Sequence, residues 1–212
     1  MVEMSIRGQV GPMSTRRRCT LSTTRQSLRT CVMSSSRQVS LTPHPSLPQG
    51  PAQSIAVCVA LDADLLSLGY KLSAHDNRVR VPPLRAVARA DELWRHTCFE
   101  AFLRIPGEGS YLELNFSPSG EWAAYRFEGY RSGMRSDPEI TAPQLQIDTT
   151  AGCELRAQVP VPPRLRTATA LTLGLAAVVE SVDGTLSYWA LRHAGATPDF
   201  HHPEGFMLEL AR

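Results

Sequence analysis

The chain has 212 residues, of which 42% are hydrophobic and 20% are charged, enough for one domain of ordinary size with a hydrophobic core. Its formal net charge of +2 provides no strong field for nucleic acid or an anionic membrane, and we expect neither as a partner. The five cysteines include no Cys-x-x-Cys pair, which argues against a disulfide framework or a zinc site and favours a reducing, cytoplasmic location.

The first 53 residues differ in composition from the rest. Residues 1–61 contain seven arginines against one acidic residue, Glu3, and four prolines lie between residues 43 and 51. Such a stretch has too little apolar surface to offset the entropy of ordering it, so we expect a disordered tail over 1–53 and a domain over 54–212. The tail resembles an organelle-targeting segment or an upstream extension before a true start at Met33, and we favour the extension. As a nucleic-acid-binding arm it would lack aromatic residues for base stacking.

From residue 54 onward, apolar residues recur at every second position, which is the pattern of β-strands. This alternation predicts strands over 55–61, 66–72, 98–105, 153–159, 171–182, 185–191 and 206–210. The Asp183-Gly184 pair is a strong signal for a hairpin between two of them. Only residues 84–93 leave room for one or two helical turns. Many short strands with so little helical periodicity predict an all-β fold, either an antiparallel β-sandwich or a barrel.

Residues 111–128 predict a hairpin around a Pro-Ser-Gly turn, and two registers are possible. In the first, a two-residue loop gathers the apolar residues on one face and sets Glu113 directly opposite Arg126. In the second, a three-residue loop places Trp122 and Arg126 on the same face as the apolar residues. We favour the first register because it keeps the arginine out of the core and forms a favourable cross-strand charge pair.

The other face of this hairpin then carries Glu113, Asn115, Trp122 and Arg126, joined by Glu100 from the preceding strand. An aromatic ring beside carboxylate, amide and guanidinium groups suits a sugar, because the ring packs against C–H bonds while planar polar groups bond the hydroxyls. Antiparallel sheets also commonly have one face that is merely hydrated. A ligand site and a hydrated face are therefore both open interpretations of these residues.

The run ELWRHTCFEAFLRIPGEGSYLELNFSPSGEWAAYRFEGYR, residues 92–131, resembles the central motif of the DOMON-like ligand-binding domains, β-sandwiches similar to the family 9 carbohydrate-binding modules. The resemblance extends over residues 55–210, including the closing segment 188–210. The matching motif residues are Trp94, Cys98, Glu100, Leu103, Tyr111, Glu113, Asn115, Pro118 and Gly120.

This resemblance implies a ligand-binding β-sandwich whose ligand is either a sugar or haem. Family 9 modules hold the sugar between two tryptophans, and here Trp94 and Trp122 would be the candidates. The family usually has an acidic residue just before the strand that starts at Cys98, where this chain has Arg95, His96 and Thr97 instead. Contacts that the family makes at that place are not expected here.

We therefore expect a non-catalytic carbohydrate-binding domain without a cofactor, because the sequence contains no G-x-S-x-G, P-loop, G-x-G-x-x-G or H-E-x-x-H motif. One alternative is a haem domain and another is a scaffold without a small ligand, and the oligomeric state stays open. A haem would need axial ligands from Met134, His96, His193, His201 or His202. The predicted ligand-binding residues are Trp94, Glu100, Glu113, Asn115, Trp122 and Arg126.

Three other features have structural interpretations. Trp189 follows the Asp-Gly turn where both strand faces are apolar, so we expect it in the core. His201 and His202 are adjacent, and neighbouring residues on a strand point to opposite faces, so we expect no shared metal ion there. Glu100 and Glu113 could sit at a glycosidase-like separation, but carboxylates on a sheet face more often pair with arginine.

Overall fold

The computed structural model describes residues 36–47, 50–62, 64–74 and 78–211. Thirteen strands form the described part of the chain, with one short α-helix and two 3-10 turns. The strands are β1 (Arg37–Pro43), β2 (Ala52–Asp62), β3 (Leu65–Ala74), β4 (Ala88–Arg89), β5 (Cys98–Arg104), β6 (Tyr111–Phe116), β7 (Glu121–Phe127), β8 (Arg135–Ser136), β9 (Gln144–Asp148), β10 (Cys153–Pro160), β11 (Ala170–Glu180), β12 (Leu186–Ala190) and β13 (Leu208–Ala211). The helical elements are η1 (Leu93–Arg95), α1 (Pro163–Arg166) and η2 (Pro203–Gly205). None of them is long and apolar enough to cross a membrane.

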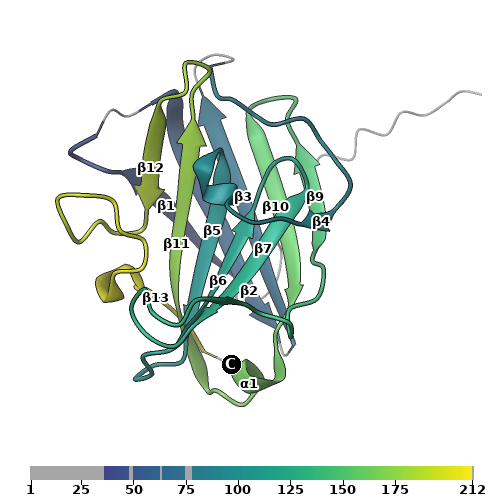
Figure 1. The fold of residues 1–212 in the computed structure, drawn as a ribbon, viewed down its shortest axis with the longest axis vertical. Helices are drawn as coiled ribbons and strands as arrows, with labels where there is room; N and C mark the ends of the chain where they lie inside the picture. Colours follow the sequence, from purple (N-terminus) through teal and green to yellow (C-terminus); the bar gives the residue numbers. More distant parts are fainter. Residues whose placement is uncertain (1–35, 48–49, 63, 75–77, 212) are drawn as a thin grey trace, which may run out of the picture. The chain divides into compact units, whose positions relative to one another are not determined.

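The strands form one curled sheet that folds into two facing layers (Figure 1). The first layer runs β9-β10-β3-β2-β1, and the second runs β12-β11-β5-β6-β7-β4. Strand β1 belongs to both layers, because its residues 37–41 pair with β2 while Thr42 and Pro43 pair with β12. All pairs between neighbouring strands are antiparallel except that of β4 with β7. The predicted all-β sandwich is therefore confirmed.

The main core lies between the two layers. Tyr70 of the first layer stacks on Phe99 of the second, with ring centroids 4.9 Å apart, and both side chains are almost fully buried. The Tyr70 hydroxyl donates a hydrogen bond of 2.8 Å to the carbonyl oxygen of Glu100, so the polar end of the ring is satisfied inside the core. Burial of large apolar side chains at about 1.5–3 kcal/mol each is what holds the layers together.

Every strand predicted from the sequence is present, and the Asp183-Gly184 hairpin joins β11 to β12. Trp189 lies in the core with 2% of its surface exposed, as expected. The stretch 84–93 was expected to hold helical turns, and this was wrong for most of it, because β4 lies there and η1 begins only at Leu93.

The expected boundary at residue 53 also needs correction. Strand β1 lies inside the stretch assigned to the tail and pairs with both β2 and β12, so the domain includes Arg37–Pro43. Backbone hydrogen bonds at a corner between layers can hold a strand of polar composition, which the composition of residues 1–61 did not indicate. The rest of the expected tail, residues 1–35, lies outside the described residues.

The hairpin of β6 and β7 adopts the second of the two registers, so the favoured one was wrong. Leu112 lies opposite Arg126, and Phe116 lies opposite Trp122. The Ser117 amide donates a hydrogen bond of 2.9 Å to the carbonyl oxygen of Glu121 across a three-residue loop. The loop ends in a glycine with a φ of 95°. This left-handed conformation suits glycine in a three-residue hairpin loop, and it fixes the register independently of the hydrophobic pattern.

The outer face of the second layer, turned away from the first layer, is covered rather than hydrated. Side chains of this face form a second apolar cluster with Leu93 of η1 and with Phe206, which follows η2. Segment η1 contacts β5, β6 and β7, while η2 contacts β11. All six residues of β6 are consequently buried, whichever face they point to.

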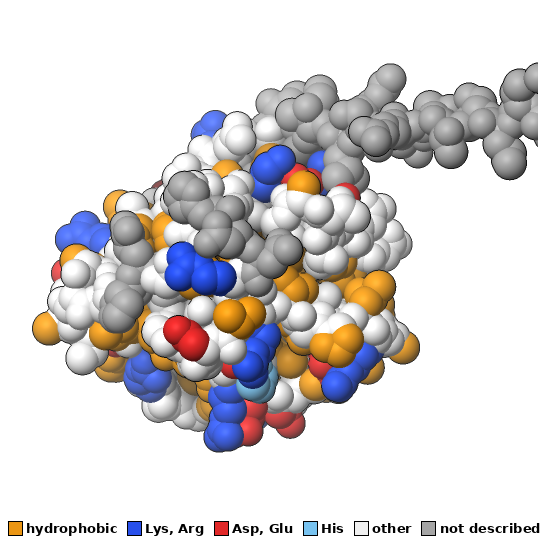
Figure 2. All heavy atoms as spheres, turned by 90° about the horizontal axis from the view of Figure 1, so that it is seen from above, with side chains coloured by type: hydrophobic (Ala, Val, Ile, Leu, Met, Phe, Trp, Pro, Cys, Tyr) orange, Lys and Arg blue, Asp and Glu red, His pale blue; other side chains and the backbone are white. Residues whose placement is uncertain are grey.

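On the end of the molecule that Figure 2 shows, basic and acidic side chains are interspersed.

Candidate functional site

Three predicted site residues lie together on the outer face of the second layer. Glu100 of β5 lies directly opposite Asn115 of β6, and Glu113 lies two residues from Asn115 on the same strand. We call these three residues the polar cluster. Their exposed fractions are 3% for Glu100, 4% for Glu113 and 0% for Asn115. The sequence therefore placed them on one face correctly, but the face is an interior surface.

The hydrogen bonds of the polar cluster are incomplete. The Asn115 side-chain amide donates a hydrogen bond of 2.7 Å to Oε1 of Glu113. Glu100 Oε1 and Asn115 Oδ1 are buried and have no hydrogen-bond partner among the described residues. A buried polar atom without a partner costs about 1–3 kcal/mol. These two oxygens are thus able to accept hydrogen bonds from a ligand that reaches them.

Burial changes the protonation of both carboxyl groups. Loss of hydration raises the pKa of Glu113 to about 7, while the hydrogen bond from Asn115 and the charge of Arg131 oppose the rise. Burial, and then the nearby Glu113 carboxylate, raise the pKa of Glu100 well above its usual range. The pair therefore carries fewer than two negative charges near neutral pH, and a protonated carboxyl can donate a hydrogen bond as well as accept one.

Aromatic rings surround the polar cluster. Trp94 of η1 is partly buried and meets the Tyr125 ring edge-on, with centroids 5.8 Å apart. The Tyr125 hydroxyl donates a hydrogen bond of 2.7 Å to the carboxylate of Asp91, just before η1, and this bond connects the turn to the sheet. On the other side, Tyr111 stacks on Phe127 with centroids 4.7 Å apart. Trp94, one of the predicted ligand-binding residues, therefore packs against the same face as the polar cluster.

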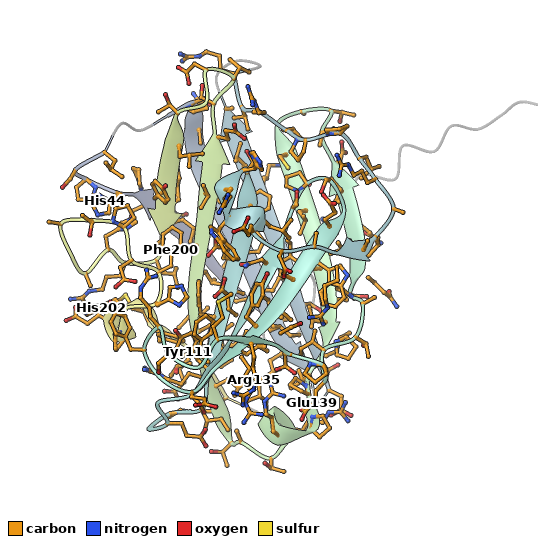
Figure 3. All side chains as sticks on the ribbon, in the orientation of Figure 1. His44, Tyr111, Arg135, Glu139, Phe200 and His202 are labelled. Carbon is orange, nitrogen blue, oxygen red and sulfur yellow. The ribbon has the colours of Figure 1, made fainter. Side chains whose placement is uncertain are left out.

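Two loops far apart in sequence meet over this face near Tyr111, which Figure 3 labels. The Tyr111 hydroxyl lies 2.8 Å from Nδ1 of His201 and accepts a hydrogen bond of 3.2 Å from the backbone amide of Arg131. The Arg131 guanidinium donates a hydrogen bond of 2.7 Å to the Asp199 carboxylate, which also accepts a hydrogen bond from the Tyr130 hydroxyl. These contacts join residues 130–131 to residues 199–201 above the sheet. No local spacing pattern in the sequence indicates these contacts, because the partners lie 68 to 90 residues apart.

His201 is the part of this cover that reaches the polar cluster. Its Nε2 lies 3.9 Å from Oε2 of Glu113, and its ring packs against Phe102 and Phe127. Burial and the charge of Arg131 lower the pKa of His201 to about 4, so the ring is neutral near pH 7. Its neighbour His202 instead accepts a hydrogen bond from the Glu204 amide at the start of η2. Within the described ranges, no group of three or more His, Cys, Asp or Glu side chains is placed to hold a metal ion.

Two predicted site residues lie elsewhere. Trp122 points into the core between the layers with 4% of its surface exposed, and the Arg89 guanidinium lies 4.4 Å from its ring centroid. Arg126 lies on the same inner side, opposite Leu112, and Glu113 faces Tyr125 instead of Arg126. The reason is the hairpin register described above. Trp122 consequently cannot stack on a ligand at the outer face, and the expected pair of Glu113 with Arg126 does not form.

Three of the histidines named as haem ligands contact other groups of the protein. His96 contacts Glu180 at 2.8 Å, His193 contacts the Thr42 carbonyl at 2.9 Å, and His201 contacts Tyr111. Met134 is 48% exposed. The haem-binding alternative implied by the resemblance pairs Met with His, or two His, on one iron. Among the described residues, these contacts do not bring such a pair together.

The comparisons with known proteins concern the fold. No protein-family model matches the chain, and no curated protein matches it. A crystal structure at 2.70 Å of a candidate carbohydrate-binding protein from Bacteroides uniformis ATCC 8492 superposes with a TM-score of 0.61. The match covers 82% of this chain and 85% of that chain at 12% sequence identity. At this identity the likeness shows a shared fold, the two-layered β-sandwich.

Proposed function

We propose that this β-sandwich is a non-catalytic carbohydrate-binding domain and that the sugar binds at the polar cluster, with Trp94 and Tyr125 as the aromatic side of the site. The observation that carries the proposal is the pair of unpartnered oxygens, Glu100 Oε1 and Asn115 Oδ1, on a face lined by aromatic rings. The motif resemblance to DOMON-like domains and the shared fold with a candidate carbohydrate-binding protein support it.

The chemistry of the cluster suits a neutral polyol. Each sugar hydroxyl donates one hydrogen bond and accepts others, and the cluster offers both an amide oxygen and a carboxyl group with a raised pKa. An aromatic ring at the edge, Trp94, provides an apolar surface for the C–H face of the sugar. No cofactor takes part in this mode of binding.

Burial sets the expected affinity. Because the two free oxygens are enclosed, a sugar reaches them only when the partly exposed Trp94 side chain or the loop at Arg131 moves aside. That movement consumes part of the binding free energy. One stacked ring and a few hydrogen bonds should leave about −4 to −6 kcal/mol, a dissociation constant between millimolar and tens of micromolar.

Ligand-observed NMR against a panel of mono- and oligosaccharides tests this proposal. Trp94→Ala and Asn115→Leu should each weaken binding at least tenfold, while Glu100→Gln, which still offers a donor and an acceptor, should bind within a few-fold of the wild type. Arg95→Ala is the matched control, because Arg95 lies beside Trp94 on η1 and forms an exposed ion pair with Glu92. Thermal unfolding checks that each variant is folded. If no sugar binds, or if Trp94→Ala and Asn115→Leu bind like the wild type, the proposal is wrong.

A further inference from the structure

A separate cavity of about 140 Å³ opens at the other end of β6, on the inner side of the sandwich. Its apolar walls include Leu103 of β5, Leu112 of β6 and Leu165 of α1, which are 1%, 2% and 6% exposed. Leu103 and Leu112 are directly opposed across the two strands, and α1 closes the end of the molecule beneath them (Figure 1). These side chains give the cavity an aliphatic floor.

Two arginines, Arg126 and Arg164, also line this cavity. Arg164 is held by ion pairs with Asp137 and Glu139, so its charge is already compensated. Arg135, directly opposite Arg126 on β8, pairs with Glu128 at 2.5 Å. Figure 3 shows Arg135 and Glu139 at this end of the molecule, near α1.

Arg126 is different from the arginines around it. Its side chain is partly buried, yet within the described part of the chain it has no hydrogen bond and no ion pair. The acidic residue that lines the cavity, Glu108, is exposed and accepts a hydrogen bond of 3.1 Å from the Ser110 hydroxyl. Water screens the repulsion that an exposed carboxylate exerts on an incoming anion. The result is one uncompensated cation beside an aliphatic floor.

We propose that this cavity binds a small aliphatic carboxylate, with the head group on the Arg126 guanidinium and the short apolar tail on Leu103, Leu112 and Leu165. The planar guanidinium matches a carboxylate with two parallel hydrogen bonds. A single uncompensated positive charge matches a single negative charge, which favours a carboxylate over a phosphate dianion. This site is independent of the sugar site, because it lies on the inner face of the layer and uses none of the polar cluster.

Calorimetric titration of the full chain with hexanoate at pH 7 tests the site. Acetate, which has the head group without the tail, and 1-hexanol, which has the tail without the charge, should each bind at least tenfold more weakly. Arg126→Gln should weaken hexanoate binding about tenfold or more, since hydrogen bonds to charged groups are worth that factor. Arg95→Gln removes an exposed arginine on another face and should leave binding unchanged.

The position of the ligand gives a second readout on the wild-type protein. Hexanoate should shift the methyl NMR signals of Leu112 and Leu165, and it should leave the signals around Asn115 in place. The proposal is overturned if hexanoate does not bind, if acetate or 1-hexanol binds as tightly, if Arg126→Gln binds like the wild type, or if the shifts appear at the polar cluster.

Discussion

Replacing Glu113 by Gln should change how the stability of the protein depends on pH. Gln keeps the shape of Glu113, and its carbonyl oxygen can still accept the hydrogen bond from Asn115. It removes the ionisable group whose pKa is raised to about 7 by burial. In the unfolded chain this carboxyl group has the usual glutamate pKa of 4.5. Between these two pKa values the folded protein holds a proton that the unfolded chain releases.

The sign and size of the effect follow from this difference. Because the folded state binds more protons between pH 4.5 and about 7, the free energy of unfolding falls as pH rises through that window. The full contribution is present below the unfolded pKa and is lost at about pH 7. At about 1.36 kcal/mol per pKa unit, the wild type should lose about 3 kcal/mol relative to Glu113→Gln across the window.

Urea denaturation at several pH values between 4 and 8 measures this difference. The quantity of interest is the free energy of unfolding of the wild type minus that of Glu113→Gln at each pH, which cancels the titration of groups that do not interact with Glu113. Glu108→Gln removes an exposed carboxylate and is the matched control. A difference that stays constant from pH 4 to pH 8 would refute the reasoning, because it would mean that Glu113 titrates alike in the folded and unfolded chain.

Three other outcomes are expected. His201→Gln should reveal the opposite trend, because burial lowers the folded pKa of His201 to about 4. As pH falls from 6.5 to 4, the free energy of unfolding of the wild type should fall by about 3 kcal/mol relative to that of the variant. A difference between the two proteins that stays constant with pH in urea denaturation would contradict this expectation. Trp122→Ala should lower the free energy of unfolding by about 3–5 kcal/mol because the ring is buried between the layers, and a loss near 1 kcal/mol would place the ring outside the core. A chain that starts at residue 52 lacks β1 and should unfold at a clearly lower temperature than one that starts at residue 36; equal melting temperatures would show that β1 contributes nothing.

The sequence alone determined the fold class and most of the strands, because alternation with a period of two follows directly from strand geometry. The same rule placed Glu113 and Asn115 on one face of β6, and the alternation in β5 put Glu100 on that face as well. The burial of Trp189 could be predicted for a related reason, since both faces of its strand are apolar.

Only the tertiary structure decided the register of the β6–β7 hairpin and the state of its outer face. The prediction assumed that one face is wet, so that an arginine must be kept off the apolar face. In the folded chain η1 and the loops at residues 130–131 and 199–201 cover the outer face, and Arg126 lies at the end of the inner face beside a cavity. When both faces of a strand are buried, hydrophobic alternation no longer distinguishes the two registers, and the turn geometry at Gly120 settles the pairing. The cover over the polar cluster is built from segments 68 to 90 residues apart, and a local sequence pattern carries no information about contacts at that distance.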